Sequence, residues 1–181
     1  MDDIVKQALV KWPNVPDCYG WLGLDARGNW YLRDYGAQAS GPFCGGPAQS
    51  KGSRLEHARL IEFIGRNYAH DASGQWFFQN GPQRVYVELE ITPFIWHVDP
   101  DLTLHSHNGQ TGQVQEAVLD EQGRLYVQTD IGFGLIHSMD MGHAVNAVEQ
   151  GLWLPQEMLC ANLPAHFAYV TSPQTRQLQA T

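Results

Sequence analysis

Residues 71–77 read DASGQWF, and the same pattern of Asp, two residues, Gly and then bulky side chains occurs at two other places in the chain. Residues 25–31 read DARGNWY, and residues 120–126 read DEQGRLY. An Asp at the first position of a turn can accept hydrogen bonds from backbone N–H groups that follow it, and a Gly three positions later tolerates a positive φ. Aromatic and β-branched neighbours favour extended strands. The pattern therefore predicts three β-hairpins, each closed by a type I turn with a Gly bulge.

The spacing of these hairpins bears on the architecture. Asp25, Asp71 and Asp120 begin the three turns at nearly even intervals, as expected for a repeated supersecondary unit. Chance recurrence of a common turn explains the spacing equally well, and the sequence leaves both readings open. We predict an α+β fold with antiparallel sheets of short strands and hairpins. An internal structural repeat is one of the two interpretations of the turn spacing.

Helical periodicity appears in three segments, where apolar residues recur every three or four positions. Ser53 and Glu56 fit a capping box for the second of these helices, and Asp140 is placed to cap the third. We therefore expect about three helices packed on the sheets. The predicted helices cover residues 3–11, 54–68 and 141–150.

Short strands are predicted through most of residues 75–136. In residues 85–92, VYVELEIT, apolar and polar residues alternate, so we expect Glu88 and Glu90 on the face that meets water. The Gly- and Pro-rich residues 36–52 are predicted to form a loop.

Two lobes that share one core are expected from this order of elements. The N-terminal lobe, residues 1–98, contains helix, hairpin, helix and hairpin. The C-terminal lobe, residues 99–181, is rich in β-structure, has one helix and includes a short strand at residues 167–170.

Residues 60–94, LIEFIGRNYAHDASGQWFFQNGPQRVYVELEITPF, resemble a bacterial family of uncharacterised proteins. Members carry a helix, an Asp-x-x-Gly turn, an aromatic pair, a Pro and a Val-x-Val-x-Asp/Glu-x-Pro-Phe ending. Residues 28–34, GNWYLRD, are similar to an aromatic strand of the same family. The resemblance implies an α+β fold with repeated motifs and a part in signal transduction. It implies no catalytic residues.

Composition narrows the classes of partner. The chain has 181 residues, 11 Lys and Arg residues and a formal net charge of −8, which argues against binding to nucleic acid because such binding depends on clustered cations. No apolar run is long enough for a membrane span, and the first residues do not resemble a secretion signal. Cys18, Cys44 and Cys160 are odd in number and form no Cys-x-x-Cys pair, which favours free thiols and a cytoplasmic location.

Four residues form the strongest metal-ligating pattern. His97 and Asp99, and likewise His105 and His107, are two positions apart, so on a strand the members of each pair share a face. All four are therefore candidate ligands of one metal ion. The alternative is the polar, solvated face of an edge hairpin that ends at Asn108-Gly109, and that alternative is favoured.

Two other groups could carry chemistry. Glu88 and Glu90 could divide acid and base roles on one strand face, although a solvated strand face explains them more simply. Residues 132–143, GFGLIHSMDMGH, hold Ser, His and Asp, but helix capping by Ser138 or Asp140 accounts for them without a nucleophilic site.

The composition and motifs together favour a regulatory module that binds a small-molecule ligand or a protein partner. A small metal-assisted enzyme that uses His97, Asp99, His105 and His107 is the alternative, and a purely structural subunit is a third hypothesis. Catalytic residues and cofactors are not assigned from the sequence, and neither is an oligomeric state.

Overall fold

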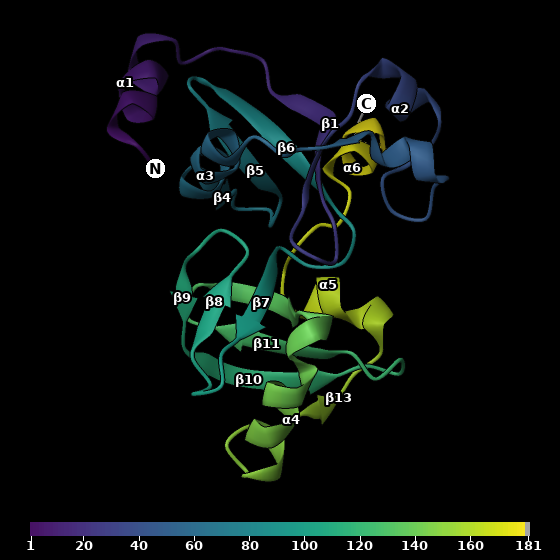
Figure 1. Cartoon of the computed structure of the whole chain (residues 1–181). Coiled ribbons are helices and arrows are strands. Elements are labelled where there is room, and N and C mark those ends of the chain that lie inside the picture. Colours follow the sequence, from purple (N-terminus) through teal and green to yellow (C-terminus); the bar gives the residue numbers. More distant parts are fainter. Residues whose placement is uncertain (180–181) are drawn as a thin grey trace. The chain divides into compact units, whose positions relative to one another are not determined.

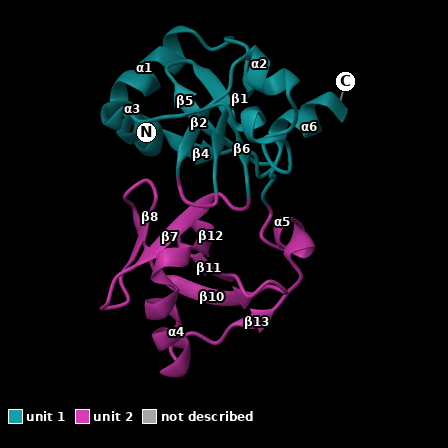
Figure 2. Ribbon diagram, turned by 45° about the vertical axis from the view of Figure 1, so that its right-hand side comes forward, with its two compact units in different colours: residues 1–25, 29–90, 169–181 teal, residues 26–28, 91–168 magenta. Residues whose placement is uncertain are grey.

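The computed structural model describes residues 1–179, and the chain forms two compact units (Figure 2). The first unit comprises residues 1–25, residues 29–90 and the segment from Tyr169 onward, and the second comprises residues 26–28 and 91–168. This division differs from the expected lobes, 1–98 and 99–181. Residues 94–98 pair with strands of the second unit, and the C-terminal helix contacts strands of the first.

The first unit is built on a mixed sheet of six described strands in the order β3-β2-β1-β6-β5-β4. Figure 1 labels β1, β6, β5 and β4 of this sheet. Its strands are β1 (Cys18–Leu24), β2 (Trp30–Leu32), β3 (Ser53–Arg54), β4 (Tyr68–His70), β5 (Trp76–Asn80) and β6 (Gln83–Leu89). Its helices are α1 (Asp3–Lys11), α2 (Tyr35–Ala39), the 3₁₀ turn η1 (Ala48–Lys51), α3 (Ala58–Arg66) and α6 (Pro173–Gln179).

The second unit is built on a mixed sheet of seven described strands in the order β13-β10-β11-β12-β7-β8-β9. Its strands are β7 (Phe94–Val98), β8 (Leu104–Ser106), β9 (Thr111–Gly112), β10 (Val114–Leu119), β11 (Leu125–Thr129), β12 (Gly132–Ile136) and β13 (Gln156–Glu157). Its helical segments are η2 (Ser138–Asp140), α4 (Met141–Glu149), η3 (Cys160–Asn162) and α5 (Leu163–His166).

The three predicted Asp-x-x-Gly hairpins are confirmed. The turns join β1 to β2, β4 to β5 and β10 to β11, and each strand pair is antiparallel. Gly28, Gly74 and Gly123 adopt φ values of +80°, +77° and +74°, in the region that Gly tolerates. The Asp carboxylate accepts the N–H of the residue four positions later in all three turns. A repeat of larger units around these turns stays a prediction.

Two more turns of the same backbone form lie in the second unit, and neither has the Asp-x-x-Gly pattern, although Asn108-Gly109 was expected to mark a turn. The Asp99 N–H bonds to Thr103 O at 3.0 Å, and Leu102 occupies the Gly position with φ +66°. In the next turn Ser106 takes the place of Asp, and its Oγ accepts the Gln110 N–H at 3.0 Å. The sequence pattern missed both turns because each replaces one of its two defining residues.

The expectation of purely antiparallel sheets is wrong. The strand pairs β1–β6, β7–β12 and β10–β13 are parallel. The strands of each parallel pair are far apart in the sequence, whereas turn chemistry predicts pairing between consecutive strands alone.

The predicted helices at the two ends of the set are confirmed as α1 and α4, but the middle one is shorter than predicted. Ser53 and Arg54 form β3 against β2, so no capping box forms, and the His57 side chain instead accepts the Leu60 N–H at the start of α3. Three helices among the described residues, α2, α5 and α6, were not predicted. Residues 36–52, expected as a loop, include α2 and η1, and residues 167–170 do not form a strand.

The face of β6 that was expected to meet water is largely buried, although the side chain of Glu90 beyond the strand is 27% exposed. Tyr86 and Glu88 are each 3% exposed, and Thr92, just beyond the strand, is 1% exposed. The segment before α6 covers this face, because Thr171 O accepts the Leu89 N–H and the Ser172 hydroxyl donates to Glu88. Alternation along one strand cannot show that a distant segment covers the second face.

Candidate functional site

A pocket of about 550 Å³ opens on one face of the six-stranded sheet in the first unit. Leu22 lies opposite Leu32, and Phe78 lies opposite Val85, so neighbouring strands present these side chains on a common face. All four line the pocket. Strand pairing therefore forms an apolar floor.

Helix α3 supplies a second apolar wall. Leu60 and Ile64 are four positions apart, so they lie on the same face of the helix, and both line the pocket. The Phe63 ring meets the Phe78 ring edge-on with centroids 5.5 Å apart, which holds α3 against β5. The packing of Phe63 on Phe78 thus holds the α3 wall in place.

Two charged side chains line the pocket, those of Arg33 and Asp34, and both make hydrogen bonds within the protein. Arg33, which is 1% exposed, donates from Nε to Ser50 O at 2.7 Å and from Nη2 to Gly41 O at 2.7 Å. The Asp34 carboxylate accepts the Ala37 N–H at 2.8 Å and caps α2. Arg33 is the one cation among the residues that line the pocket, so the pocket presents no cation dedicated to an anionic ligand.

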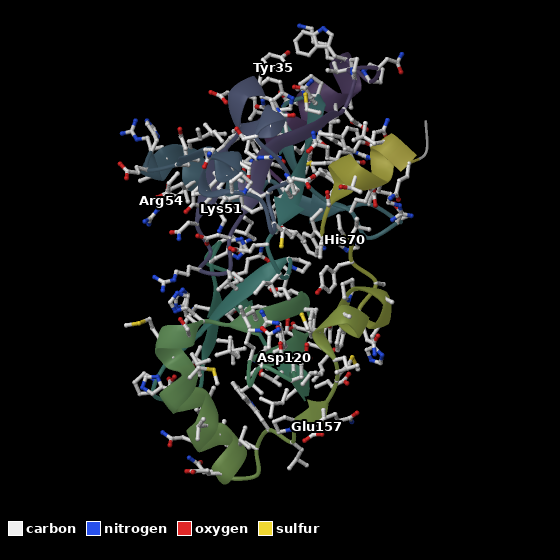
Figure 3. All side chains as sticks on the ribbon, turned by 90° about the vertical axis from the view of Figure 1, so that its right-hand side faces the viewer. Tyr35, Lys51, Arg54, His70, Asp120 and Glu157 are labelled. Carbon is white, nitrogen blue, oxygen red and sulfur yellow. The ribbon has the colours of Figure 1, made fainter. Side chains whose placement is uncertain are left out.

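Exposed rings and aliphatic side chains mark the mouth of the pocket. Trp21 and Leu32 line it, and Leu32 is 46% exposed. The Tyr35 ring packs edge-on against Trp21 at 4.8 Å, and Tyr35 is 78% exposed at the start of α2 (Figure 3). Exposed apolar surface that continues into a pocket is typical of a binding site.

The four predicted metal ligands lie in the second unit. His97 and His105 are directly opposite each other in the β7–β8 pair, and His105 Nε2 lies 3.0 Å from Asp99 Oδ2. His107 lies against Phe94, with ring centroids 6.0 Å apart, and its Nδ1 accepts the Ile95 N–H. The assignment of these four residues as ligands of one metal ion stays a prediction.

A different group, which we call the histidine cluster, is formed by His97, His137 and Asp140. One ligand atom from each lies within 4.8 Å of the others. His97 Nδ1 is 2.8 Å from Asp140 Oδ2, and the His97 and His137 rings stack with centroids 4.5 Å apart. Among the described residues, this is the one group of three metal-capable His, Cys, Asp or Glu side chains at such short range.

Strand register explains how the histidine cluster forms. Ile136 pairs with Trp96 in the parallel strands β12 and β7, so the next residues, His137 and His97, are also neighbours. The 3₁₀ turn η2 then brings Asp140 back toward His137, because positions three apart align in a 3₁₀ helix. The expected cap by Asp140 is wrong, since Asp140 makes no capping bond to α4 and its carboxylate contacts His97 instead.

The two glutamates of β6 line a smaller pocket of about 270 Å³ together with Cys44. Glu88 accepts from the Ser172 hydroxyl and from the Gln174 N–H, and Glu90 forms an ion pair with Lys51 at 2.7 Å. Burial raises the pKa of Glu88, and the two donors and the charge of Arg33 oppose this rise. Each carboxylate thus has its own structural partner.

Residues 1–176 match the family model DUF2944, which is described as "Protein of unknown function (DUF2946)". The chain belongs to this family. The expected relation to a family of uncharacterised proteins is therefore confirmed at this level, while the bacterial source, the internal repeat and the role in signal transduction stay predictions.

Two solved structures resemble the chain. A DUF1285 family protein from Silicibacter pomeroyi DSS-3 has a TM-score of 0.50 and 13% identity, over 81% of this chain and 84% of that chain. A DUF1285 family protein from Shewanella baltica OS155 has a TM-score of 0.47 and 15% identity, over 70% and 91%. At 13% identity, the likeness to the Silicibacter pomeroyi protein concerns the fold alone.

A comparison with curated proteins finds no match. Among the described residues, no helix has both the length and the apolar character needed to cross a membrane. The three cysteines are free thiols, as predicted.

Proposed function

We propose that the protein is a binding module whose first unit takes up a small, largely apolar molecule in the pocket between α3 and the sheet. The observation that supports this most is the 550 Å³ pocket with apolar side chains on its floor and on the α3 wall. Small-molecule sites commonly enclose about 300–1,000 Å³ and combine apolar walls with a few polar groups. The two charged lining residues, Arg33 and Asp34, make their hydrogen bonds within the protein, which favours a neutral ligand.

Binding is a better account of this pocket than catalysis. Its lining contains neither His nor Cys, and its one carboxylate, that of Asp34, caps a helix. We extend the proposal to a regulatory part in bacterial signal transduction, which is the role that the family resemblance implies, and to a cytoplasmic location, which the cysteine pattern favours. The alternative, a metal-assisted enzyme built on His97, Asp99, His105 and His107, receives no support from the arrangement of these residues.

The proposal is tested with 1-aminoanthracene, a neutral apolar probe that fluoresces on transfer from water. We expect saturable binding of one probe per chain. Leu60→Trp places a large side chain in the pocket and should weaken binding at least tenfold. The matched control is Ile61→Trp, which makes the same change at the next position of α3, outside the lining, and should bind within threefold of the natural protein.

Equal affinities of the two Trp variants would overturn the proposal, and so would the absence of saturable binding. Circular dichroism establishes that each variant is folded. If Leu60→Trp does not fold, Leu32→Glu serves in its place, because Leu32 lines the pocket and is already 46% exposed. A charge at this position should exclude the apolar probe without disturbing the core.

A further inference from the structure

We propose that the histidine cluster, His97, His137 and Asp140, binds one divalent transition-metal ion, with Zn²⁺ as its first candidate. This site lies in the second unit and is independent of the apolar pocket. Two imidazole nitrogens and one carboxylate oxygen form a donor set that suits zinc and related ions. Strand register and a 3₁₀ turn bring together three residues that are up to 43 positions apart.

The distances require small movements. A tetrahedral zinc ion with ligand bonds of about 2.0–2.2 Å separates its ligand atoms by about 3.3–3.6 Å. His97 Nδ1 and Asp140 Oδ2 are 2.8 Å apart, so an ion can replace the hydrogen that they share after a slight opening of the pair. The nitrogen of His137 lies within 4.8 Å of the other two ligand atoms, so a shift of at most about 1.5 Å, which a side-chain rotation can supply, brings it into range.

Metal binding also alters an existing hydrogen bond of His137. His137 Nδ1 accepts the Met139 N–H at 3.2 Å, so the neutral ring carries its proton on Nε2. Binding through either nitrogen alters this contact. The bond is long and lies at an exposed turn, so its loss costs little compared with a metal–imidazole bond.

Solvent reaches the cluster. The side chain of His97 is 43% exposed and that of Asp140 is 21% exposed. An ion can therefore enter from water, and the three protein ligands leave a fourth tetrahedral position open to water or another small ligand. His105 lies opposite His97 on the next strand, but it is paired with Asp99 and stands outside the cluster.

The test is isothermal titration of untagged, chelator-treated full-length protein with Zn²⁺, together with Co²⁺ absorption spectra. We expect one saturable site per chain. His137→Ala and Asp140→Asn should each weaken binding by at least about 100-fold. Two changes, at the neighbouring His105 and at the exposed His57 of the other unit, serve as matched controls. His105→Ala and His57→Ala should bind within threefold of the natural protein.

Three results would overturn the proposal. One is the absence of a saturable site, and another is binding that persists in His137→Ala and Asp140→Asn. The third is binding that His105→Ala or His107→Ala abolishes, which would move the ion to the four residues predicted from the sequence. If a cluster variant does not fold, X-ray absorption of the zinc-loaded natural protein counts its imidazole ligands, and any number other than two contradicts the assignment.

Discussion

At the scale of the residue, the Asp of each predicted turn acts as an acceptor for several donors. Asp120 receives the Gln122 and Arg124 N–H groups at 2.9 Å each and the Tyr126 hydroxyl, also at 2.9 Å. Burial alone would raise the pKa of Asp120, but the backbone and side-chain donors of Arg124 and the Tyr126 hydroxyl outweigh it and lower the pKa. The two backbone N–H contacts are local to the turn, which is why the sequence pattern predicted them, whereas the Tyr126 hydroxyl contact was not predicted.

At Glu88 burial outweighs the hydrogen-bond donors, and this predicts how the stability of the protein depends on pH. Burial raises the pKa of Glu88 above its usual value of 4.5. The folded chain therefore keeps this proton at pH values where the unfolded chain has lost it, and the stabilisation is lost as pH rises through the folded pKa. We expect the natural protein to lose stability relative to Glu88→Gln as pH rises from about 4.5. Urea unfolding of both proteins across this pH range measures the difference.

A second change strengthens the test at Glu88. The Ser172 hydroxyl lowers the pKa of Glu88 by donating to it, so Ser172→Ala should raise that pKa further and move the pH-dependent window upward. A stability difference between the natural protein and Glu88→Gln that does not change with pH would contradict the account of this carboxyl.

At the scale of the element, the Asp-x-x-Gly turns and the helices α1 and α4 were predictable, because their signals are contained within a few residues. Helix α3 was predicted four residues too early, since Ser53 and Arg54 pair with β2 and the capping pattern cannot reveal that pairing. The short helix α2, Tyr35–Ala39, was missed because five residues are too few to show a helical repeat of apolar residues. Asp34 is a favoured N-cap residue, so its position could have indicated the start of this helix.

The turns also provide a prediction. A Cβ added at Gly109 or Gly123 meets no atom within 4 Å, so each change tests backbone conformation alone. Gly109→Ala and Gly123→Ala should each lower the free energy of unfolding by about 1 kcal/mol, because Ala is strained at positive φ. Leu102 already has φ +66°, so Leu102→Gly should be neutral or slightly stabilising. Urea unfolding compares the three variants, and an equal loss in Leu102→Gly would contradict this reading.

At the scale of the whole molecule, the parallel strand pairs and the two units were beyond the reach of local patterns. The pair β1–β6 joins segments separated by more than sixty positions, and nothing in either strand specifies its partner. The histidine cluster depends on the same kind of pairing. Sequence reasoning singled out His97 in one motif and His137 and Asp140 in another, and only the register of β7 and β12 connects them.

The separation of the two proposed sites leads to a prediction for hydrogen exchange. A ligand at about 100 times its Kd stabilises the state that binds it by about 2.7 kcal/mol, which slows exchange through unfolding about 100-fold. Zn²⁺ should protect amides of β7 and β12, whereas 1-aminoanthracene should protect amides of β1, β2 and α3. Equal protection of both units by either addition would show that the sites do not act separately.

The central claim is that the first unit holds a small apolar ligand between α3 and its sheet. Methyl NMR of the full-length protein during titration with 1-aminoanthracene tests it most directly. We predict saturable shifts for the methyl groups of Leu22, Leu60, Ile64 and Val85, and no change for Leu163 of the second unit. Shifts confined to exposed residues of α1, such as Ile4 and Val10, or no saturable shifts at all, would contradict the account.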